Sequence, residues 1–567
     1  MASQSHLAIT APAQRSFRPS AESALAAALS VLVALLVLAP VLAVALAAVA
    51  DGAGISARFL ATALASTRVI GNTLFVAVGT TVLAVALGGV LALVLVRIDT
   101  PGRGVLEQFV ILPLYVTPLL TAIAWSWLGS PRGGLINLLA RETLGLTDGL
   151  VNLHSAGGVV FVAALAYAPL PFLLIAAVLR AMDPALEDSA RIHGASAASA
   201  FARVTLPLAL PAALGSALLV FVQAMGLFSV PAVLGIPSGF QVVGTEIYRL
   251  LNNYPPRAGQ AAAWGFLLLA VTAVLVFVQA VVLDRRSFVT VTGKAFRPRV
   301  VGVGPVRHLL AALAWLYVVA AVILPVLTLV WGALVNFLTV DPRLMAFDLR
   351  HFSYVLFTYP KTYLAAGNSL LLGVATATLV CAIGFGVAWV VVRTRGAARG
   401  FLDQVSMVPL ALPSMVLALG LLWTYAGLTW LPVYGTIFIL LIAYVTHFLP
   451  FGVRAASGAL RQLHPELEDA ARVAGAGLFD TFRLVVLPLA RPSLIAAWTL
   501  LFILAMQEVS ASILLYTSRS TVLSVAVFDL WEAGNLNGLA ALSVMQLAVT
   551  FLALVVVLRA RQREVAA

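Results

Sequence analysis

Residues 186–195 read Leu-Glu-Asp-Ser-Ala-Arg-Ile-His-Gly-Ala, and residues 467–476, 281 positions later, read Leu-Glu-Asp-Ala-Ala-Arg-Val-Ala-Gly-Ala. Over the ungapped segments 184–211 and 465–492, 15 of 28 positions are identical. Unrelated amphipathic segments would share far fewer residues, so the match indicates an internal duplication. Each copy is a charged island between long apolar runs. We therefore expect both copies to lie outside a bilayer, at the same face.

The composition excludes an ordinary soluble domain. The chain is 62% hydrophobic and 10% charged, with a mean hydropathy of +1.05, whereas soluble domains are about 25% charged. Its apolar runs are continuous, which favours helices over a barrel, because lipid leaves no partner for an exposed backbone amide. We predict an all-α membrane protein with about twelve transmembrane helices in two tandem six-helix repeats. The predicted spans lie near 24–50, 69–96, 107–128, 157–179, 205–235, 261–283, 308–335, 364–392, 404–426, 434–453, 486–516 and 538–558.

The distribution of Arg and Lys predicts the orientation, because cytoplasmic loops carry the positive excess. With the N-terminus inside, 24 of the 34 basic residues fall in the cytoplasm and 10 outside. Both termini and both charged islands are therefore expected to be cytoplasmic. The net charge of +12 is then explained by topology and by anionic lipid, and no nucleic-acid partner is expected.

The predicted domain organisation follows from these spans. A second repeated motif supports the duplication, because Gly-Asn-Thr-Leu at 71–74 recurs as Gly-Asn-Ser-Leu at 367–370. The predicted parts are a cytoplasmic tail (1–22), a first repeat (23–284), a cytoplasmic linker rich in Arg, Gly and Pro (285–307), a second repeat (308–559) and a cytoplasmic tail (560–567).

The charged islands have the signals of a short helix followed by a turn. Asp183 suits an N-cap and Pro184 the first helical position, and Gly194 suits the end of the helix. Acidic residues in the first turns favour the helix dipole, and Arg191 follows on the same face. A solvated surface helix is the alternative reading of either copy alone. The repetition of the whole pattern in both halves weakens that alternative.

An acidic residue, two small residues, three variable positions, a glycine and a later Leu-Pro resemble the EAA loop of ABC importer permeases. Both islands fit, at 188–207 and 469–488, although Asp stands for the usual Glu and the first copy has Ser189 for Ala. These departures leave open which carboxylate makes the main contact. The resemblance implies ATPase-coupling loops at 183–207 and 464–488. Their expected site residues are Glu187, Asp188, Ala190, Arg191, Gly194, Glu468, Asp469, Ala471, Arg472 and Gly475.

The same resemblance implies partners. The two lysines, Lys294 and Lys361, do not lie in a G-x-x-x-x-G-K-[ST] motif, so we expect no ATP hydrolysis and no catalytic residue in this chain. We expect no cofactor either, since ATP and Mg²⁺ would be used by two copies of a cytoplasmic ABC ATPase subunit. A solute-binding protein would deliver cargo from outside. The expected location is the bacterial inner membrane, as a multi-pass protein in contact with lipid.

Polar residues inside spans are costly and become candidates for the translocation path. Glu508 is predicted to lie well inside the eleventh span, and its counterpart in the first half is Leu227. It is either a cation-facing or gating carboxylate, or an acid paired within the bundle. Gln507 and Asn368 are further path candidates, although Asn368, like Asn72 and His447, also suits interhelical hydrogen bonding.

The cargo is less strongly indicated. Seven dispersed histidines and a single cysteine give no cluster with metal-ligand spacing, so no dedicated metal site is expected. The run 508–532 resembles the C-terminal half of ferric iron permeases of the fused type, which favours iron(III). Fused permeases for thiamine, phosphonates and polyamines share the architecture.

Two other classes of function remain as alternatives. An ion-coupled secondary transporter also uses internal repeats, often inverted, and would need intramembrane carboxylates or histidines in both halves. A scaffold or channel without energy coupling is the other alternative. Six spans per half place both repeats in the same orientation and Glu508 is nearly alone, which counts against the first alternative. The duplicated loop counts against the second.

Overall fold

A computed structural model describes residues 21–51, 54–55, 58–145, 149–284, 300–336, 346–428 and 430–566. It is helical apart from two short antiparallel strands, β1 (Ala50–Asp51) and β2 (Gly54–Ile55), and two isolated bridges. The predicted all-α membrane class is confirmed. Residues 1–20 and 285–299, which include most of the expected N-terminal tail and linker, lie outside the described residues.

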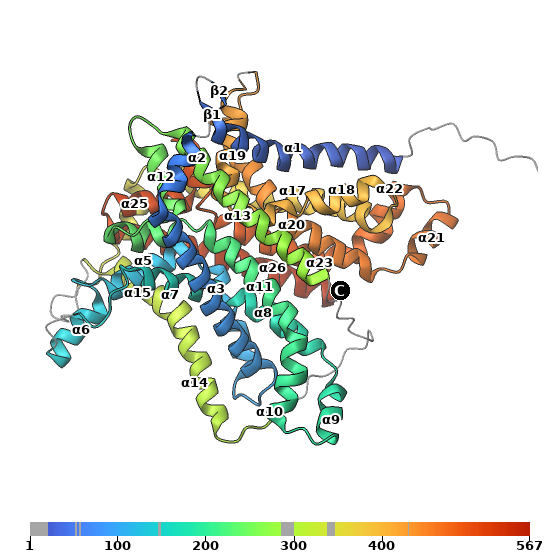
Figure 1. Cartoon of the computed structure of the whole chain (residues 1–567), viewed down its shortest axis with the longest axis horizontal. Helices are drawn as coiled ribbons and strands as arrows, with labels where there is room; N and C mark the ends of the chain where they lie inside the picture. The colour runs from blue at the N-terminus through green and yellow to red at the C-terminus, as the bar shows by residue number, and fades with distance from the viewer. Residues whose placement is uncertain are drawn as a thin grey trace, which may run out of the picture.

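The first half contains thirteen α-helices in the described residues, shown in Figure 1 from blue to green. They are α1 (Ala21–Val49), α2 (Arg58–Ala65), α3 (Thr67–Val96), α4 (Arg103–Val110), α5 (Pro118–Gly129), α6 (Leu135–Leu144), α7 (Ala156–Tyr167), α8 (Pro169–Ala181), α9 (Pro184–Ile192), α10 (Ala197–Ala200), α11 (Leu206–Met225), α12 (Val243–Asn252) and α13 (Ala258–Asp284).

The second half repeats most of this order within the part of the chain that the structure describes. Its helices are α14 (Val306–Val318), α15 (Leu324–Leu334), α16 (Arg350–Ser353), α17 (Thr362–Arg393), α18 (Ala397–Val405), α19 (Ser414–Ala426), α20 (Ile437–Gln462), α21 (Glu466–Val473), α22 (Leu478–Thr481), α23 (Leu487–Met506), α24 (Ser512–Leu515), α25 (Leu523–Glu532) and α26 (Leu536–Ala566).

Nine helices in the described residues are long and apolar enough to cross a membrane, and the number rises to twelve if each of three bent pairs is one span. The pair ending in α5 bends by 97°, α7 and α8 by 42°, and the pair ending in α19 by 110°. A proline lies at each bend, Pro118, Pro169 and Pro413, where it cannot donate a helical hydrogen bond. The strongest bends occur at equivalent places in both halves, so the bend belongs to the repeated unit.

Two predicted spans extend too far. The spans expected at 205–235 and 486–516 leave the helix after Met225 and Met506. Glu508 therefore lies beyond the end of α23, and its predicted place inside a helical span is wrong. The apolar run continues past each break because the following loops are themselves buried; Val230 and Val509, for example, have little exposed surface. A hydropathy pattern indicates that a segment is buried, but it does not indicate whether the segment is helical.

The first helix of each half packs on the other half. Helix α1 contacts α18 and α19 of the second half, and α14 contacts α3 and α4 of the first. In Figure 1, α1 runs along the arm that contains α17, and α14 runs along the arm that contains α3. Tyr317, at the end of α14, donates a hydrogen bond of 3.0 Å to the carbonyl of Leu165 in α7. Because the first helix of each half packs against the other half, the two repeats form one body.

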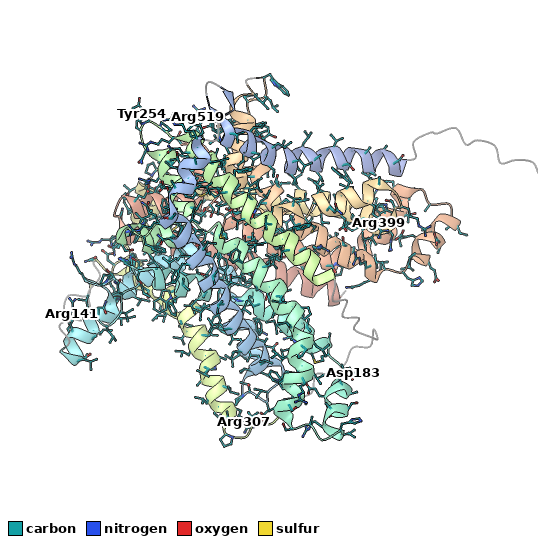
Figure 2. All side chains as sticks on the ribbon, viewed as in Figure 1. Arg141, Asp183, Tyr254, Arg307, Arg399 and Arg519 are labelled. Carbon is teal, nitrogen blue, oxygen red and sulfur yellow. The ribbon has the colours of Figure 1, made fainter. Side chains whose placement is uncertain are left out.

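The described end of the linker is tied to the first half. The amide of Val301 donates to the carbonyl of Arg97 at 2.8 Å, and Arg307 pairs with Asp99 at 3.0 Å. In Figure 2, Asp183, Arg307 and Arg399 lie toward the side of the molecule that carries α9 and α21. Arg141, Tyr254 and Arg519 lie toward the opposite side.

Candidate functional site: two coupling loops and a central cavity

Each charged island forms a short helix that ends in a left-handed glycine. The carboxylate of Asp183 accepts a hydrogen bond of 2.9 Å from the amide of Ala185 and caps α9. Gly194 has φ +88° and Gly475 has φ +89°. The amide after each glycine donates to the carbonyl five residues earlier, at 3.0 Å in both copies, which is the Schellman arrangement. The helix α9 and its counterpart α21 are therefore held in the same shape, at the ends of two diverging arms (Figure 1).

The two glutamates of the islands face inward. Glu187 is buried and accepts hydrogen bonds from Arg97, just beyond the end of α3, and from the Thr205 hydroxyl. Glu468 is buried and accepts from Arg393, the last residue of α17, at 2.7 Å. Arg97 and Arg393 occupy equivalent places in the two repeats. Each coupling loop is thus fastened to the end of the same long helix of its own half.

Apolar side chains face outward beside the exposed charged ones. Ile192 is 83% exposed and Val473 is 90% exposed, and they are equivalent residues. Leu186 and Leu467, also equivalent, are both exposed. We call these four residues the docking surface. None of the four was among the residues expected from the sequence; the signal was an apolar residue kept at the same place in both copies within a charged helix.

The other expected loop residues lie around these two groups. Asp188 and Ala190 are half-buried, whereas Arg191 and Asp469 are exposed. Ala471 is half-buried, and the side chain of Arg472 lies outside the described part of the structure. The arrangement separates the paired acids: Glu187 and Glu468 hold the loops to the helices, and the neighbouring aspartates lie nearer the surface.

The N-terminal part of α3 holds the start of α12. The Asn72 side-chain amide donates to the carbonyl of Gln241 at 2.9 Å. The Thr73 hydroxyl accepts from the amide of Val243 at 2.9 Å. Since Arg97 binds the coupling loop at the far end, α3 connects that loop with α12. Its 30 residues span about 45 Å at 1.5 Å per residue.

Helix α17 makes the same two connections in the second half. The Asn368 side-chain amide donates to the carbonyl of Thr521 at 2.9 Å, and the Ser369 hydroxyl accepts from the amide of Leu523 at 2.8 Å. Asn368 therefore bonds to the chain before α25 and does not line the cavity described next. The motif Gly-Asn-[Thr/Ser]-Leu thus has the same structural role in both repeats.

A cavity of about 270 Å³ lies between the two halves. Tyr167 and Gln223 line it from the first half, and His447, Gln507 and Glu508 line it from the second. The structure thereby brings together two of the three path residues expected from the sequence. The side-chain amide of Gln507 also crosses between the halves, donating to the carbonyl of Leu114 at 3.2 Å.

An aromatic contact joins the halves beside this cavity. Phe228, whose chain neighbours line the cavity, packs against Tyr248 of α12 and Phe528 of α25, with ring centroids 5.1 and 5.4 Å away. The Tyr248 hydroxyl donates to Glu532 at 3.0 Å. Helices α12 and α25 lie on the side opposite to α9 and α21 (Figure 1). In this structure the halves therefore meet on the side of the cavity that is away from the coupling loops.

Among the described residues, no three His, Cys, Asp or Glu side chains are grouped so that they could hold a metal ion. The cavity lies between two repeats. In each repeat one long helix leads to a charged loop, and the two loops lie at the same side of the molecule (Figure 1). This is the arrangement of a membrane transporter built from two equivalent halves.

The family comparison identifies the kind of transporter. Residues 20–288 and 380–565 match the family described as binding-protein-dependent transport system inner membrane component. The chain belongs to this family, and the resemblance seen in the loop sequences is confirmed.

Similar proteins carry more specific names. The ferric transport system permease protein FbpB of Actinobacillus pleuropneumoniae is 27% identical over 483 residues, which cover 82% of this chain and 67% of that protein. A Salmonella typhimurium protein described as a 2-aminoethylphosphonate transport system permease is 30% identical over 207 residues, 36% of this chain and 77% of its own. A crystal structure of a bacterial ABC transporter for alginate import aligns with TM-score 0.38 and 22% identity over 43% of this chain and 88% of that chain.

Proposed function

We propose that this chain, as the permease of a binding-protein-dependent ABC importer, moves ferric iron inward. The observation that supports ferric iron as the cargo is the match to a ferric transport permease over 82% of the chain, which extends into both repeats. The phosphonate-system protein matches only 36% of the chain. The family assignment also favours an ATP-driven importer over an ion-coupled secondary transporter or an uncoupled channel.

The coupling loops are proposed to bind two copies of a cytoplasmic ABC ATPase subunit. Two equivalent sets of exposed apolar residues, around Ile192 and Val473, offer two equivalent contacts, and buried apolar surface is the main source of association energy. With these loops in the cytoplasm, both termini are proposed to be cytoplasmic as well, which the distribution of Arg and Lys favours. A solute-binding protein would then meet the opposite side, where α12 and α25 lie (Figure 1).

Helices α3 and α17 are proposed to transmit ATPase closure. Each is bonded at one end to a coupling loop and at the other to α12 or α25. A rigid helix with fixed ends passes a displacement of one end to the other. Movement of α9 and α21 would therefore change the contact between Tyr248 and Phe528, whose ring centroids are 5.9 Å apart, and open or close the cavity on that side.

Charged residues on the docking surface should prevent ATPase binding. The double variant Ile192→Asp, Val473→Asp places a carboxylate where each apolar side chain would be buried, a loss of about 2 kcal/mol for each side chain. We expect at least tenfold less ATPase subunit to co-purify with the chain. Leu144→Asp is the matched control, because Leu144 is 67% exposed and lies in α6, away from both loops. Equal recovery from the double variant and the control would contradict docking at this surface.

Uptake of labelled ferric iron by cells with and without this chain tests the cargo. Thiamine, 2-aminoethylphosphonate and a polyamine are measured in parallel. We expect loss of iron uptake alone when the chain is absent. Loss of another solute, with iron uptake unchanged, would keep the permease and reject iron as its cargo.

A further inference from the structure

Glu508 is a half-buried acid that is not paired with a basic side chain in the described part of the chain. It forms no ion pair within the described part of the chain. One carboxylate oxygen accepts a hydrogen bond of 2.9 Å from the amide of Ala511, while the side chain lines the cavity. A charge that is partly removed from water and has no charged partner is costly. Four other carboxylates that are buried or half-buried each pair with a basic side chain: Glu187, Glu246, Glu468 and Asp529.

His447, which has a ring nitrogen left unpaired by the described residues, lines the same cavity. The side chain of His447 belongs to α20 and is 8% exposed. Its Nδ1 is buried and has no hydrogen-bond partner among the residues that the structure describes. A buried polar atom left unpaired costs about 1–3 kcal/mol. His447 and Glu508 form no ion pair with each other here, so neither satisfies the other.

The repeat shows that both groups are additions to the shared scaffold. The residues 281 positions earlier are Ala166 and Leu227, and these two also line the cavity, from the first half. By contrast, Ser229 and its equivalent Ser510 keep the same residue type on both walls. The pseudo-symmetry is therefore broken at these two positions, where the second half contributes a carboxylate and an imidazole to the cavity and the first half contributes Leu227 and Ala166.

We propose that Glu508 and His447 are ligands of a transient metal-cation site in the central cavity, which under the proposed function receives ferric iron as cargo. A carboxylate oxygen supplies the negative charge, and imidazole nitrogen is a ligand suited to iron. The cavity of about 270 Å³ holds roughly nine waters at ~30 Å³ each, so water can complete the coordination. Two protein ligands bind loosely enough for release, as passage through a pore requires.

The imidazole distinguishes a metal from an organic cation. An ammonium group of a polyamine, or the charged ring of thiamine, would gain from the Glu508 carboxylate but would give the His447 nitrogen no metal ion to coordinate. A metal cation uses both groups. Loss of His447 should therefore be as harmful as loss of Glu508 only if the cargo is a metal.

The test compares Glu508→Gln and His447→Gln with the matched control Glu142→Gln, which removes the same charge from an exposed residue of α6 that does not line the cavity. Glu508→Gln keeps an oxygen for the amide of Ala511. At low concentrations of labelled ferric citrate, we expect uptake to fall roughly tenfold or more in both site variants, the scale of affinity lost when metal sites are perturbed. The control should take up iron nearly as the unaltered chain does.

A binding measurement on the purified full chain separates the site from the transport function. With ferric citrate as the probe, we expect an electron paramagnetic resonance signal of protein-bound ferric iron that is absent from both site variants. Iron uptake by both site variants equal to that of the unaltered chain would overturn the site and leave the proposed function standing. Loss of uptake in Glu508→Gln alone would also overturn it, in favour of an organic cation. Cells that take up no iron through the unaltered chain would instead contradict the proposed cargo.

Discussion

Gly194→Pro and Gly475→Pro are each expected to abolish transport while the protein still inserts in the membrane. Proline requires φ near −65°, whereas these residues have φ +88° and +89°. In the first copy, proline also removes the hydrogen bond of 3.0 Å from the Gly194 amide to Arg191. The conflict should cost about 3 kcal/mol or more and displace the loop that follows α9 or α21. Uptake of labelled iron and the amount of chain in isolated membranes measure the two effects.

Asparagine at the same positions is the control. Asn tolerates the left-handed conformation, and nothing lies within 4 Å of a Cβ atom added at either glycine. Gly194→Asn and Gly475→Asn should therefore retain most of the uptake. Normal transport by either proline variant would show that the shape of the loop is not needed for coupling.

Arg97→Met and Arg393→Met are expected to uncouple ATP hydrolysis from transport. Methionine keeps much of the apolar length of arginine but leaves the carboxylate of Glu187 or Glu468 buried without its partner. Removing one partner of a buried ion pair costs about 3–5 kcal/mol. Arg393 also donates to the carbonyls of Leu460 and Leu463 at 3.0 and 2.8 Å, so its loss should be the more severe. The measurement is ATPase activity and uptake in the same reconstituted complex.

Arg180→Met is the matched control for these variants. Arg180 also pairs with a glutamate, Glu107, at 2.6 Å, but both side chains are partly exposed to solvent. Exposed pairs contribute about 0–1 kcal/mol, so this variant should stay coupled. If Arg97→Met and Arg393→Met kept a normal ratio of uptake to hydrolysis, transmission through α3 and α17 would be wrong.

The sequence was sufficient for the features that depend on composition and local order. Long apolar runs predicted an all-α membrane protein, because lipid leaves only internally bonded backbone stable. The two copies of the charged island predicted the duplication and the family. Gly194 and Gly475 predicted where the short helices end, because a left-handed cap is a local requirement that glycine meets.

Prediction from the sequence failed where a segment is buried but not helical. Glu508 was expected inside a helix because apolar residues flank it, but the helix ends at Met506. The residues after the break remain apolar since they pack against other helices, and a hydropathy pattern cannot distinguish the two cases. The docking surface was also missed, because an exposed Ile192 looks like a core residue until its surroundings are known.

Local sequence thus determined the class, the repeat, and the two short charged helices with their caps. Only the tertiary structure decided that Glu187 and Glu468 turn inward, since their partners Arg97 and Arg393 are 90 and 75 residues away. It also decided that Glu508 and His447 line one cavity opposite Leu227 and Ala166. Ion pairs and cavities depend on distances between remote segments, which are set by how all the helices pack together, and a linear pattern contains no information about them until the fold is known.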